Sequence, residues 1–245
     1  MTNARSILLL AGSSEARQLA GRLTAQGFDV RALKTEPPRG PTPLPVPYDL
    51  IETPDVETFR AAMAKVDVVV DASHGFDKAM TDVGKRAAES ERVPFACFQR
   101  PSWDIAEHPN WLRAPTVRAA MDMIAPDARV FSAAGWASLA DCETFSGAKL
   151  MLRQTTRHDR APPFDFVELV FGDPPFSVAD EIALFSELSV DALVCRNLGG
   201  AASRPKLEAA KALNLKVILI DRPAMPRDAL VFHDIDQMLA WAVSQ

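Results

Sequence analysis

The sequence predicts an α/β protein with two Rossmann-like lobes, in which parallel sheets are flanked by helices and a ligand cleft lies between the lobes. Apolar runs of strand length alternate along the chain with helical patterns, which is typical of parallel sheets covered on both faces. The run Val66–Val70 is almost continuously apolar, as expected of a strand that is buried on both sides. We expect one lobe over residues 1–115 and the other over residues 116–245.

The N-terminal lobe is predicted from strand and helix signals that follow one another in turn. The expected elements are the strands Ile7–Ala11, Phe28–Leu33, Val66–Val70 and Pro94–Phe98 and the helices Ser13–Gln26, Asp55–Ala64 and Lys78–Ser90. The first helix ends at a glycine, Gly27, which is a common stop signal. The segment from Pro37 to Pro47 contains six prolines and is expected to be extended or turned.

The C-terminal lobe repeats this pattern. The expected elements are the strands Arg129–Ala133, Ala148–Arg153, Val167–Val170, Ala192–Cys195 and Lys216–Ile220 and the helices Asp180–Leu188, Pro205–Leu213 and 234–243. The lobes are expected to join near residues 113–128. A cleft between two such lobes is a natural place for a ligand.

Composition and charge exclude several classes of protein. A net charge of −5 without a basic run argues against non-specific nucleic-acid binding. The three cysteines lack the spacing of a metal site, and an odd count favours reduced thiols in a cytoplasm. The apolar residues 7–11 are too few for a signal sequence or a membrane span. We therefore expect a cytoplasmic monomer or small homo-oligomer that binds a small molecule and has no metal, membrane or nucleic-acid partner.

Two polar motifs stand where predicted strands of the first lobe end, and open parallel sheets bind ligands at such ends. Gly12, Ser13, Ser14 and Glu15 form a strand-to-helix turn that can present backbone N–H groups to a phosphate. The alternative is that a serine simply caps the helix.

The second motif, Asp71-Ala72-Ser73-His74, places an acid, a hydroxyl and an imidazole beyond a buried strand. Asp71 and His74 are the candidate catalytic residues, and His74 can also anchor a carboxylate. Alternatively, Asp71 or Ser73 caps the next helix and His74 is a surface residue. A single histidine is poor evidence for a metal, and without a Gly-x-Ser-x-Gly elbow Ser73 is a poor nucleophile.

Two further strand ends carry arginine. Arg100 offers a fork of donors to a carboxylate or phosphate, and Trp103 offers a flat apolar wall. The alternative is a turn with a salt-bridged arginine. The last motif combines a cation, an amide and two glycines, Arg196, Asn197, Gly199 and Gly200. It is typical of an anion-holding turn, or of a plain loop with Gly199 at positive φ.

Taken in order, these motifs resemble the precorrin-6A reductase family of cobalamin biosynthesis over nearly the whole chain. The matching segments are Leu8–Arg17, Val70–Phe76, Arg100–Trp103, Asp173–Ser177 with Glu181, Asn197–Gly200 and Asp221–Pro223. The first five are similar to the family's Leu-Gly-Gly-Thr-Ser/Thr-Glu-Ala, Ile-Asp-Ala-Thr-His-Pro-Phe, Arg-Pro-x-Trp, Gly-Pro-Phe and Lys-Asn-x-Gly-Gly patterns, and Asp221–Pro223 completes the series.

The resemblance implies an oxidoreductase that transfers a hydride from NADPH to a macrocycle double bond of precorrin-6A, giving precorrin-6B. It also implies site residues. The cofactor-binding residues would be Gly12, Ser13, Ser14, Glu15, Ser73, His74, Asn197, Gly199 and Gly200, and the substrate-binding residues Arg100, Trp103 and Arg196. The alternative is a non-catalytic or altered-substrate relative that binds a tetrapyrrole or nucleotide.

The chain departs from the family pattern at four places, one of which is Arg196 in place of the lysine of the Lys-Asn turn. Leu33-Lys34-Thr35 replaces an Ala-Gly-Arg, Tyr48–Glu52 replaces a Gly-Gly-Phe-Gly-Gly, and Gly135-Trp136 replaces a glycine followed by a cation. The lost arginine bears on the choice between NADPH and NADH, because a cation is needed to face the 2′-phosphate. Arg31, Lys34 and Arg39 are the candidates to replace it.

Overall fold

The computed structural model describes residues 4–37 and 42–245, and the chain divides into two compact units. Unit 1 consists of the chain up to Pro101 together with Pro223–Gln245, and unit 2 is Ser102–Arg222. Each unit contains a six-stranded parallel sheet flanked by helices, which confirms the predicted α/β fold with two parallel-sheet lobes. Part of the predicted proline-rich segment, including Arg39, lies outside the described residues.

Unit 1 is a doubly wound sheet with strand order β12-β5-β4-β1-β2-β3. Its strands are β1 (Ser6–Ala11), β2 (Asp29–Lys34), β3 (Tyr48–Leu50), β4 (Val68–Ala72), β5 (Phe95–Phe98) and β12 (Leu230–Phe232), and its helices are α1 (Ser14–Ala25), α2 (Val56–Met63), α3 (Lys78–Glu91) and α7 (Ile235–Ser244). The chain winds outward from β1 through β2 to β3, then returns to β4 on the other side of β1. The direction of winding therefore reverses between β1 and β4, which is the switch point where such sheets bind ligands.

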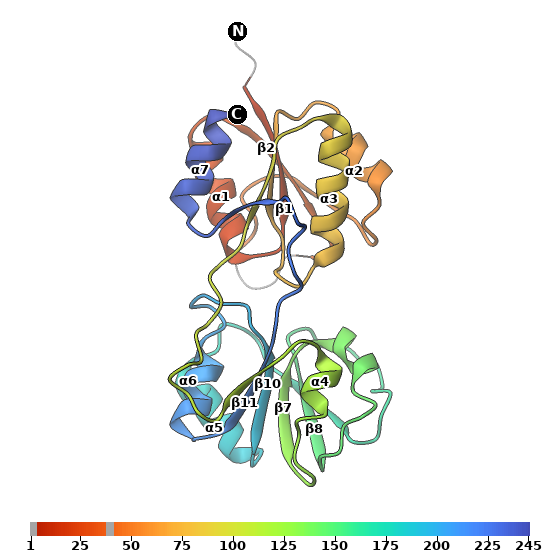
Figure 1. Cartoon of the computed structure of the whole chain (residues 1–245), viewed down its shortest axis with the longest axis vertical. Coiled ribbons are helices and arrows are strands. Elements are labelled where there is room, and N and C mark those ends of the chain that lie inside the picture. The colour runs from red at the N-terminus through yellow and green to blue at the C-terminus, as the bar shows by residue number, and fades with distance from the viewer. Residues whose placement is uncertain (1–3, 38–41) are drawn as a thin grey trace. The chain divides into compact units, whose positions relative to one another are not determined.

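Alternating side chains of β1 explain the two layers of helices in unit 1. Ile7 and Leu9 are fully buried in a cluster that includes residues of α1 and α7. Leu8 and Leu10 point to the opposite face, where they pack with residues of α2 and α3. Figure 1 shows these two helix pairs on either side of the sheet. The strand runs are continuously apolar because both of their faces are covered.

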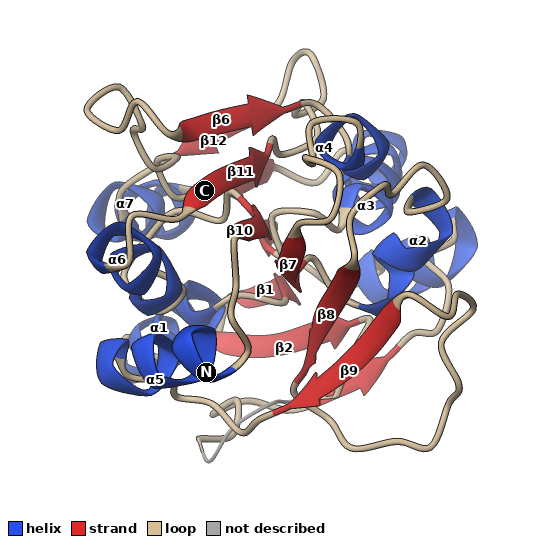
Figure 2. Ribbon diagram, turned by 90° about the horizontal axis from the view of Figure 1, so that it is seen from below, coloured by secondary structure: helices blue, strands red, loops and turns tan. Residues whose placement is uncertain are grey.

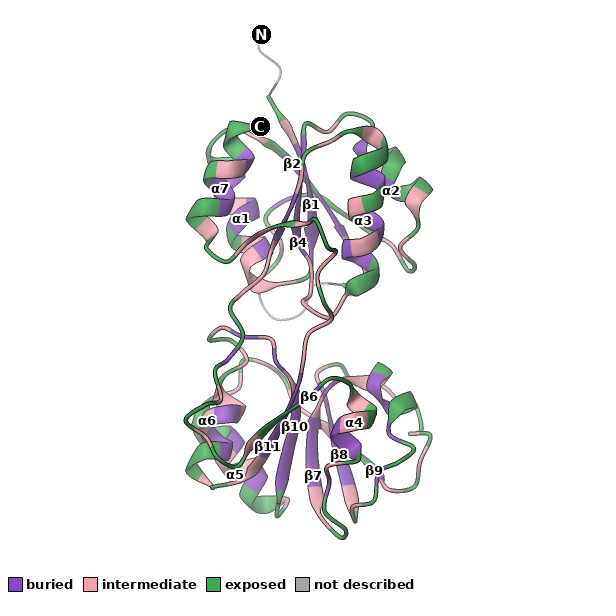
Figure 3. Ribbon diagram, in the orientation of Figure 1, coloured by how far each residue is buried: buried purple, intermediate pink, exposed green. Residues whose placement is uncertain are grey.

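Unit 2 repeats the architecture with strand order β6-β11-β10-β7-β8-β9, which can be followed in Figure 2. Its strands are β6 (Trp111–Ala114), β7 (Arg129–Ala133), β8 (Lys149–Gln154), β9 (Val167–Phe171), β10 (Ala192–Arg196) and β11 (Lys216–Ile220), and its helices are α4 (Val117–Met121), the 3₁₀ helix η1 (Trp136–Asp141), α5 (Val178–Glu187) and α6 (Pro205–Ala212). Helices α5 and α6 cover one face and α4 the other. The central strands are buried along most of their length (Figure 3).

The predicted domain boundary between residues 115 and 116 does not coincide with the division of the structure. β6 lies before that boundary but pairs in parallel with β11 of unit 2. β12 lies near the end of the chain but pairs in parallel with β5 of unit 1, and α7 adds Met238 and Leu239 to the core of that unit. Neither edge strand was predicted, because each has only three or four residues and no buried apolar run.

Candidate functional site

Some of the backbone N–H groups of the turn that follows β1 are already hydrogen-bonded within the protein. The backbone N–H groups of Gly12 and Ser13 both donate to the carbonyl oxygen of Ala72, each at 3.2 Å. The Ser13 side chain caps α1 by accepting from the N–H of Ala16 at 3.2 Å. The N–H groups of Ser14 and Glu15 lie in the first turn of α1. N–H groups in this turn have no acceptor within the helix. These two groups, together with the helix dipole, are the part of the turn suited to a phosphate.

Gly12 brings this turn into contact with the turn that follows β4. A Cβ atom on Gly12 would lie 2.5 Å from the backbone nitrogen of His74, so no larger residue fits without moving the backbone. Gly12, Ser13, Ser73 and His74 were all predicted to bind the cofactor, and the structure brings the four together. They meet at the reversal of strand winding in unit 1.

Glu15 and Arg100 form an ion pair beside the same helix start. The Oε2 atom of Glu15 lies 3.3 Å from Nε of Arg100, and both side chains are largely buried, with exposed fractions of 13% and 15%. The Ser14 hydroxyl donates to the same carboxylate oxygen at 3.0 Å. Arg100 was predicted to bind substrate and Glu15 to bind cofactor. The structure therefore places a predicted substrate residue directly beside the predicted cofactor turn.

Asp71 is a buried carboxyl that organises the end of β4. It is 2% exposed, and its oxygens accept from the N–H of Ser73 at 3.0 Å and from the Thr81 hydroxyl at 2.6 Å. Burial raises the pKa of Asp71, while the hydrogen bonds from Thr81 and Ser73 lower it in part. The thiol of Cys97 lies 3.6 Å away, and burial, with the nearby Asp71 charge, raises the pKa of this cysteine. These contacts give Asp71 a structural role in holding the Ser73–His74 turn, and its predicted catalytic role stays a prediction.

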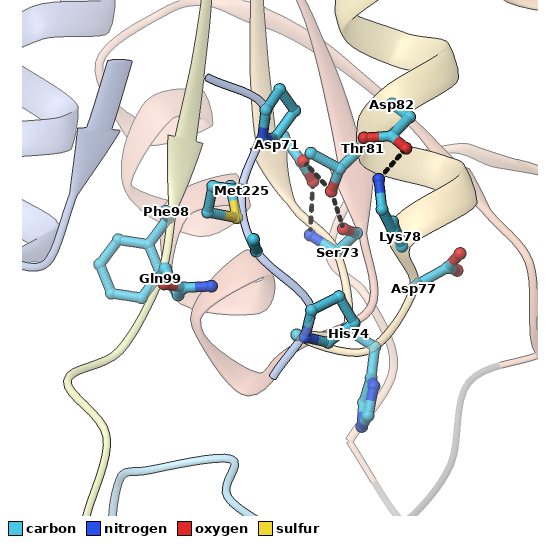
Figure 4. A pocket seen from close by; sticks show the side chains of 14 residues that line it. Asp71, Ser73, His74, Asp77, Lys78, Thr81, Asp82, Phe98, Gln99 and Met225 are labelled. Carbon is cyan, nitrogen blue, oxygen red and sulfur yellow. Dashed lines mark hydrogen bonds and ion pairs between the residues drawn. The ribbon is translucent and has the colours of Figure 1, made fainter. Parts of the chain in front are cut away.

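A pocket opens next to this turn, within unit 1 (Figure 4). Its wall consists of Asp71, Ser73, His74, Gly75, Asp77, Lys78, Thr81, Asp82, Phe98, Gln99, Pro223, Ala224, Met225 and Pro226. The volume counted to its open mouth is about 380 Å³. Figure 4 shows His74 pointing away from the group formed by Asp71, Thr81 and Ser73. His74 Nδ1 accepts from the N–H of Phe76 at 3.2 Å.

The predicted residues of unit 2 form a second group. Asn197 is 2% exposed, and its amide accepts from the Trp103 N–H at 3.0 Å and donates to the Trp103 carbonyl at 3.4 Å. The Trp103 indole donates to the carbonyl of Gly200 at 3.0 Å. Gly199 has a φ of 66°, as expected of the alternative, a plain loop. Trp103 belongs to the core of unit 2, so its observed contacts and those of Asn197 are structural, and ligand binding by either residue stays a prediction.

Arg196 ends β10 and lies against the turn that follows β7. A Cβ atom on Gly135 would lie 3.9 Å from both terminal nitrogens of the Arg196 guanidinium. In the strand order of unit 2, β7 and β10 are neighbours at which the winding reverses. Arg196 is thus at the switch point of its own sheet, where a cationic side chain that binds the substrate would be expected.

Several residues of the pocket in unit 1 were not predicted. Thr81 is ten residues from Asp71 in the sequence and faces it only because α3 packs back on the sheet. Met225 and its neighbours reach the pocket on the segment leading to β12, a strand that was not predicted from the sequence. The prolines of this segment, Pro223 and Pro226, were the only local signal of an ordered turn there.

In the part of the chain that the structure describes, no helix is long and apolar enough to cross a membrane. Within residues 4–37 and 42–245, no group of three or more His, Cys, Asp or Glu side chains is placed to hold a metal ion.

Comparisons with known proteins agree with the geometry. The family model described as precorrin-6x reductase CbiJ/CobK matches residues 6–243. The precorrin-6A reductase of Rhodococcus erythropolis is 32% identical over 244 residues, covering 96% of each chain. That of Rhodobacter capsulatus is 31% identical, covering 96% of this chain and 94% of the relative.

Among solved structures, the one titled CobK precorrin-6A reductase superposes with a TM-score of 0.88 at 29% identity. The match covers 98% of this chain and 96% of that one. Because the family model and the relatives span nearly the entire sequence, both units are included in the likeness. The chain therefore belongs to the precorrin-6x reductase CbiJ/CobK family.

Proposed function

We propose that this oxidoreductase reduces precorrin-6A to precorrin-6B with NADPH. The family supplies the reaction class. The observation that carries the cofactor assignment is the contact between the Gly12 turn and the Ser73–His74 turn, at the reversal of winding in unit 1. Dinucleotides bind at this position in doubly wound sheets.

The residues around this turn fit a dinucleotide. The absence of a Cβ on Gly12 lets the two turns approach, and the N–H groups of Ser14 and Glu15 would hold a phosphate at the start of α1. The adjoining pocket has apolar side chains, Phe98 and Met225, that would contact the nicotinamide ring. When bound, the nicotinamide supplies the hydride.

His74 is the residue of this pocket best suited to orient the substrate. Because Nδ1 of His74 accepts a backbone hydrogen bond, a neutral ring carries its proton on Nε2 and can donate a hydrogen bond from there. Reduction of a macrocycle double bond adds a hydride and a proton, and a neutral imidazole is too weak an acid to give up its own, so this proton comes from water. We assign His74 the role of donating a hydrogen bond that positions the substrate. Asp71, through Ser73, holds the turn on which His74 stands.

Lys34 is the proposed partner of the 2′-phosphate that distinguishes NADPH from NADH. It is the last residue of β2, and the end of this strand is where the ribose of a dinucleotide is recognised. The Lys34 ammonium lies 5.9 Å from the centre of the Tyr48 ring, on the strand that occupies the place of the family's glycine segment. Replacement of Lys34 by alanine should raise the KM for NADPH about tenfold, since one charge-assisted contact is lost.

The experiment is anaerobic turnover of precorrin-6A, followed by the loss of near-ultraviolet absorbance of the nicotinamide. The wild-type protein should turn over with NADPH, and Lys34→Ala should leave the KM for NADH unchanged. An equal rise in the KM for NADPH and the KM for NADH in Lys34→Ala would contradict the assignment of Lys34. Absence of turnover with either nicotinamide would contradict the proposed function, and tetrapyrrole binding without turnover would favour a non-catalytic role.

A further inference from the structure

Three aromatic side chains meet at the carboxyl edge of the sheet in unit 2. Strands β7, β8 and β9 are neighbours there. Trp136 follows β7, His158 lies four residues after the end of β8, and Phe171 ends β9. Open parallel sheets place ligands at this edge. None of the three residues belongs to the predicted site.

The three rings form one continuous group. The Trp136 and His158 ring centres are 4.9 Å apart with an interplanar angle of 88°. Those of His158 and Phe171 are 5.5 Å apart at 75°. All three side chains are half-buried. The group therefore offers apolar ring surface that is not fully enclosed by the core.

Two exposed arginines stand over these rings. The Arg160 guanidinium lies 5.9 Å from the centre of Trp136, and that of Arg157 lies 5.8 Å from the centre of Phe171. Over the described part of the chain, neither arginine is within ion-pair distance of a carboxylate. An exposed guanidinium held over a ring face has N–H groups that can bind a carboxylate.

Gln154 gives an independent sign that the group lacks a partner. It is 9% exposed, and its Oε1 lies 3.3 Å from Nε2 of His158. His158 Nδ1 accepts from the N–H of Arg160 at 3.2 Å, so the proton of a neutral ring is on Nε2 and faces Gln154 Oε1. This arrangement leaves the amide nitrogen of Gln154 buried and without a hydrogen-bond partner among the described residues. Such a donor is costly, and a ligand oxygen reached by a small rotation of the amide would satisfy it.

We propose that Trp136, His158 and Arg160 form a substrate subsite that binds a conjugated macrocycle through its ring and one of its carboxylates. The ligand class follows from the combination of ring surface, unpaired guanidinium groups and a buried amide donor. The subsite adjoins Arg196, because Gly135, against which that guanidinium lies, immediately precedes Trp136. The proposal rests on the proposed function, since it names further contacts for the same substrate.

The kinetic test compares Trp136→Leu and Arg160→Gln with Arg118→Gln. Arg118 is an exposed arginine elsewhere in unit 2, paired with Glu143, and serves as the matched control. Trp136→Leu and Arg160→Gln should each raise the KM for precorrin-6A about tenfold and leave the KM for NADPH within about twofold. Circular dichroism establishes that the variants are folded. A KM for precorrin-6A equal to that of the wild type in both variants would overturn the subsite.

A binding test separates this proposal from the reaction itself. The probe is uroporphyrin I, a stable tetrapyrrole that carries carboxylates around its ring, titrated into the full-length protein by fluorescence. Both variants should bind it about tenfold more weakly than the wild type and Arg118→Gln, even if no turnover is found. The subsite is overturned if the wild type does not bind the porphyrin or if both variants bind it as the wild type does. It is also overturned if Trp136→Leu weakens NADPH to the same extent, because the rings would then serve the cofactor.

Discussion

At the scale of single residues, Asp71 shows how a polar strand end becomes structural. Its carboxyl is enclosed by the sheet and by α3, and its hydrogen bonds go to Ser73 and Thr81. Burial disfavours the charged form, so folding raises the pKa of this carboxyl above its ordinary value of 3.8. Its neutral form therefore stabilises the fold below about pH 3.8, and this contribution is lost as the pH rises through the folded-state pKa.

Replacement of Asp71 by asparagine should remove this pH dependence. As the pH rises above 3.8, the wild type should lose stability because Asp71 ionises, whereas Asp71→Asn should not lose it for this reason. The free energy of unfolding of the variant should therefore rise relative to that of the wild type, by at most about 1.4 kcal/mol per pH unit. Urea denaturation at several pH values measures it. Asp55→Asn is a control with the opposite sign: the hydrogen bonds from Thr58 lower the pKa of Asp55, so this variant should lose stability relative to the wild type as the pH rises. A difference for Asp71→Asn that does not change with pH would refute the argument.

A second prediction concerns the contact at Gly12. Gly12→Ala places a methyl group 2.5 Å from the backbone nitrogen of His74, so the two turns must separate. We expect a loss of about 1–3 kcal/mol in stability, together with weaker NADPH binding in a calorimetric titration. The control is Gly21→Ala in α1, where the nearest neighbour of a Cβ, Pro45, is 3.9 Å away. That variant should be as stable as the wild type or more so, since alanine favours the helix.

At the scale of elements, a buried ion pair connects β8 to α5. Arg153 Nη2 lies 2.8 Å from Glu181 Oε2, and both side chains are less than a tenth exposed. The guanidinium lies 4.9 Å from the ring centre of Phe131 and 4.0 Å from that of Phe176. Such a pair is kept because each charge would be costly alone in this place.

Replacement of Glu181 by alanine should therefore destabilise unit 2. It leaves the Arg153 charge buried without its partner, which typically costs about 3–5 kcal/mol. Glu187→Ala, an exposed change on the same helix, should alter stability by less than about 0.5 kcal/mol. Urea denaturation compares the two. Equal stabilities of Glu181→Ala and Glu187→Ala would show that the Arg153 guanidinium is stabilised by the rings of Phe131 and Phe176 alone.

The same scale shows what the sequence could predict. The strands β7 and β11 were predicted with the bounds that they have, because each is an apolar run between polar or turn residues. β3, β6 and β12 were missed, since an edge strand is defined by its partner and these three are short and partly exposed. At the site, the contact between the Gly12 and His74 turns follows from the strand order. The acceptor of the Gly12 N–H, Ala72, and the partner of Asp71, Thr81, depend on packing that no local pattern contains.

At the scale of the whole molecule, the two units differ in how the chain builds them. All six strands of unit 2 lie within the continuous segment 102–222, whereas unit 1 needs β12 and α7 from the far end of the chain. The fragment 102–222 should therefore unfold cooperatively on its own. The fragment 1–101 should not, because it lacks an edge strand and the buried Met238, Leu239 and Ala242. Circular dichroism during heating tests both, and a cooperative transition of fragment 1–101 at the midpoint of the full-length protein would contradict the prediction.

The late position of β12 also has a consequence for synthesis on the ribosome. Unit 2 emerges complete while the first hundred residues still lack their last strand, so the edge of β5 is uncovered until β12 has left the exit tunnel. An open strand edge invites pairing with other chains. Any truncated product that stops before Leu230 keeps this edge open, and the edge closes once β12 pairs with β5. Products with and without β12 therefore differ in their tendency to pair with other chains, before either binds a ligand.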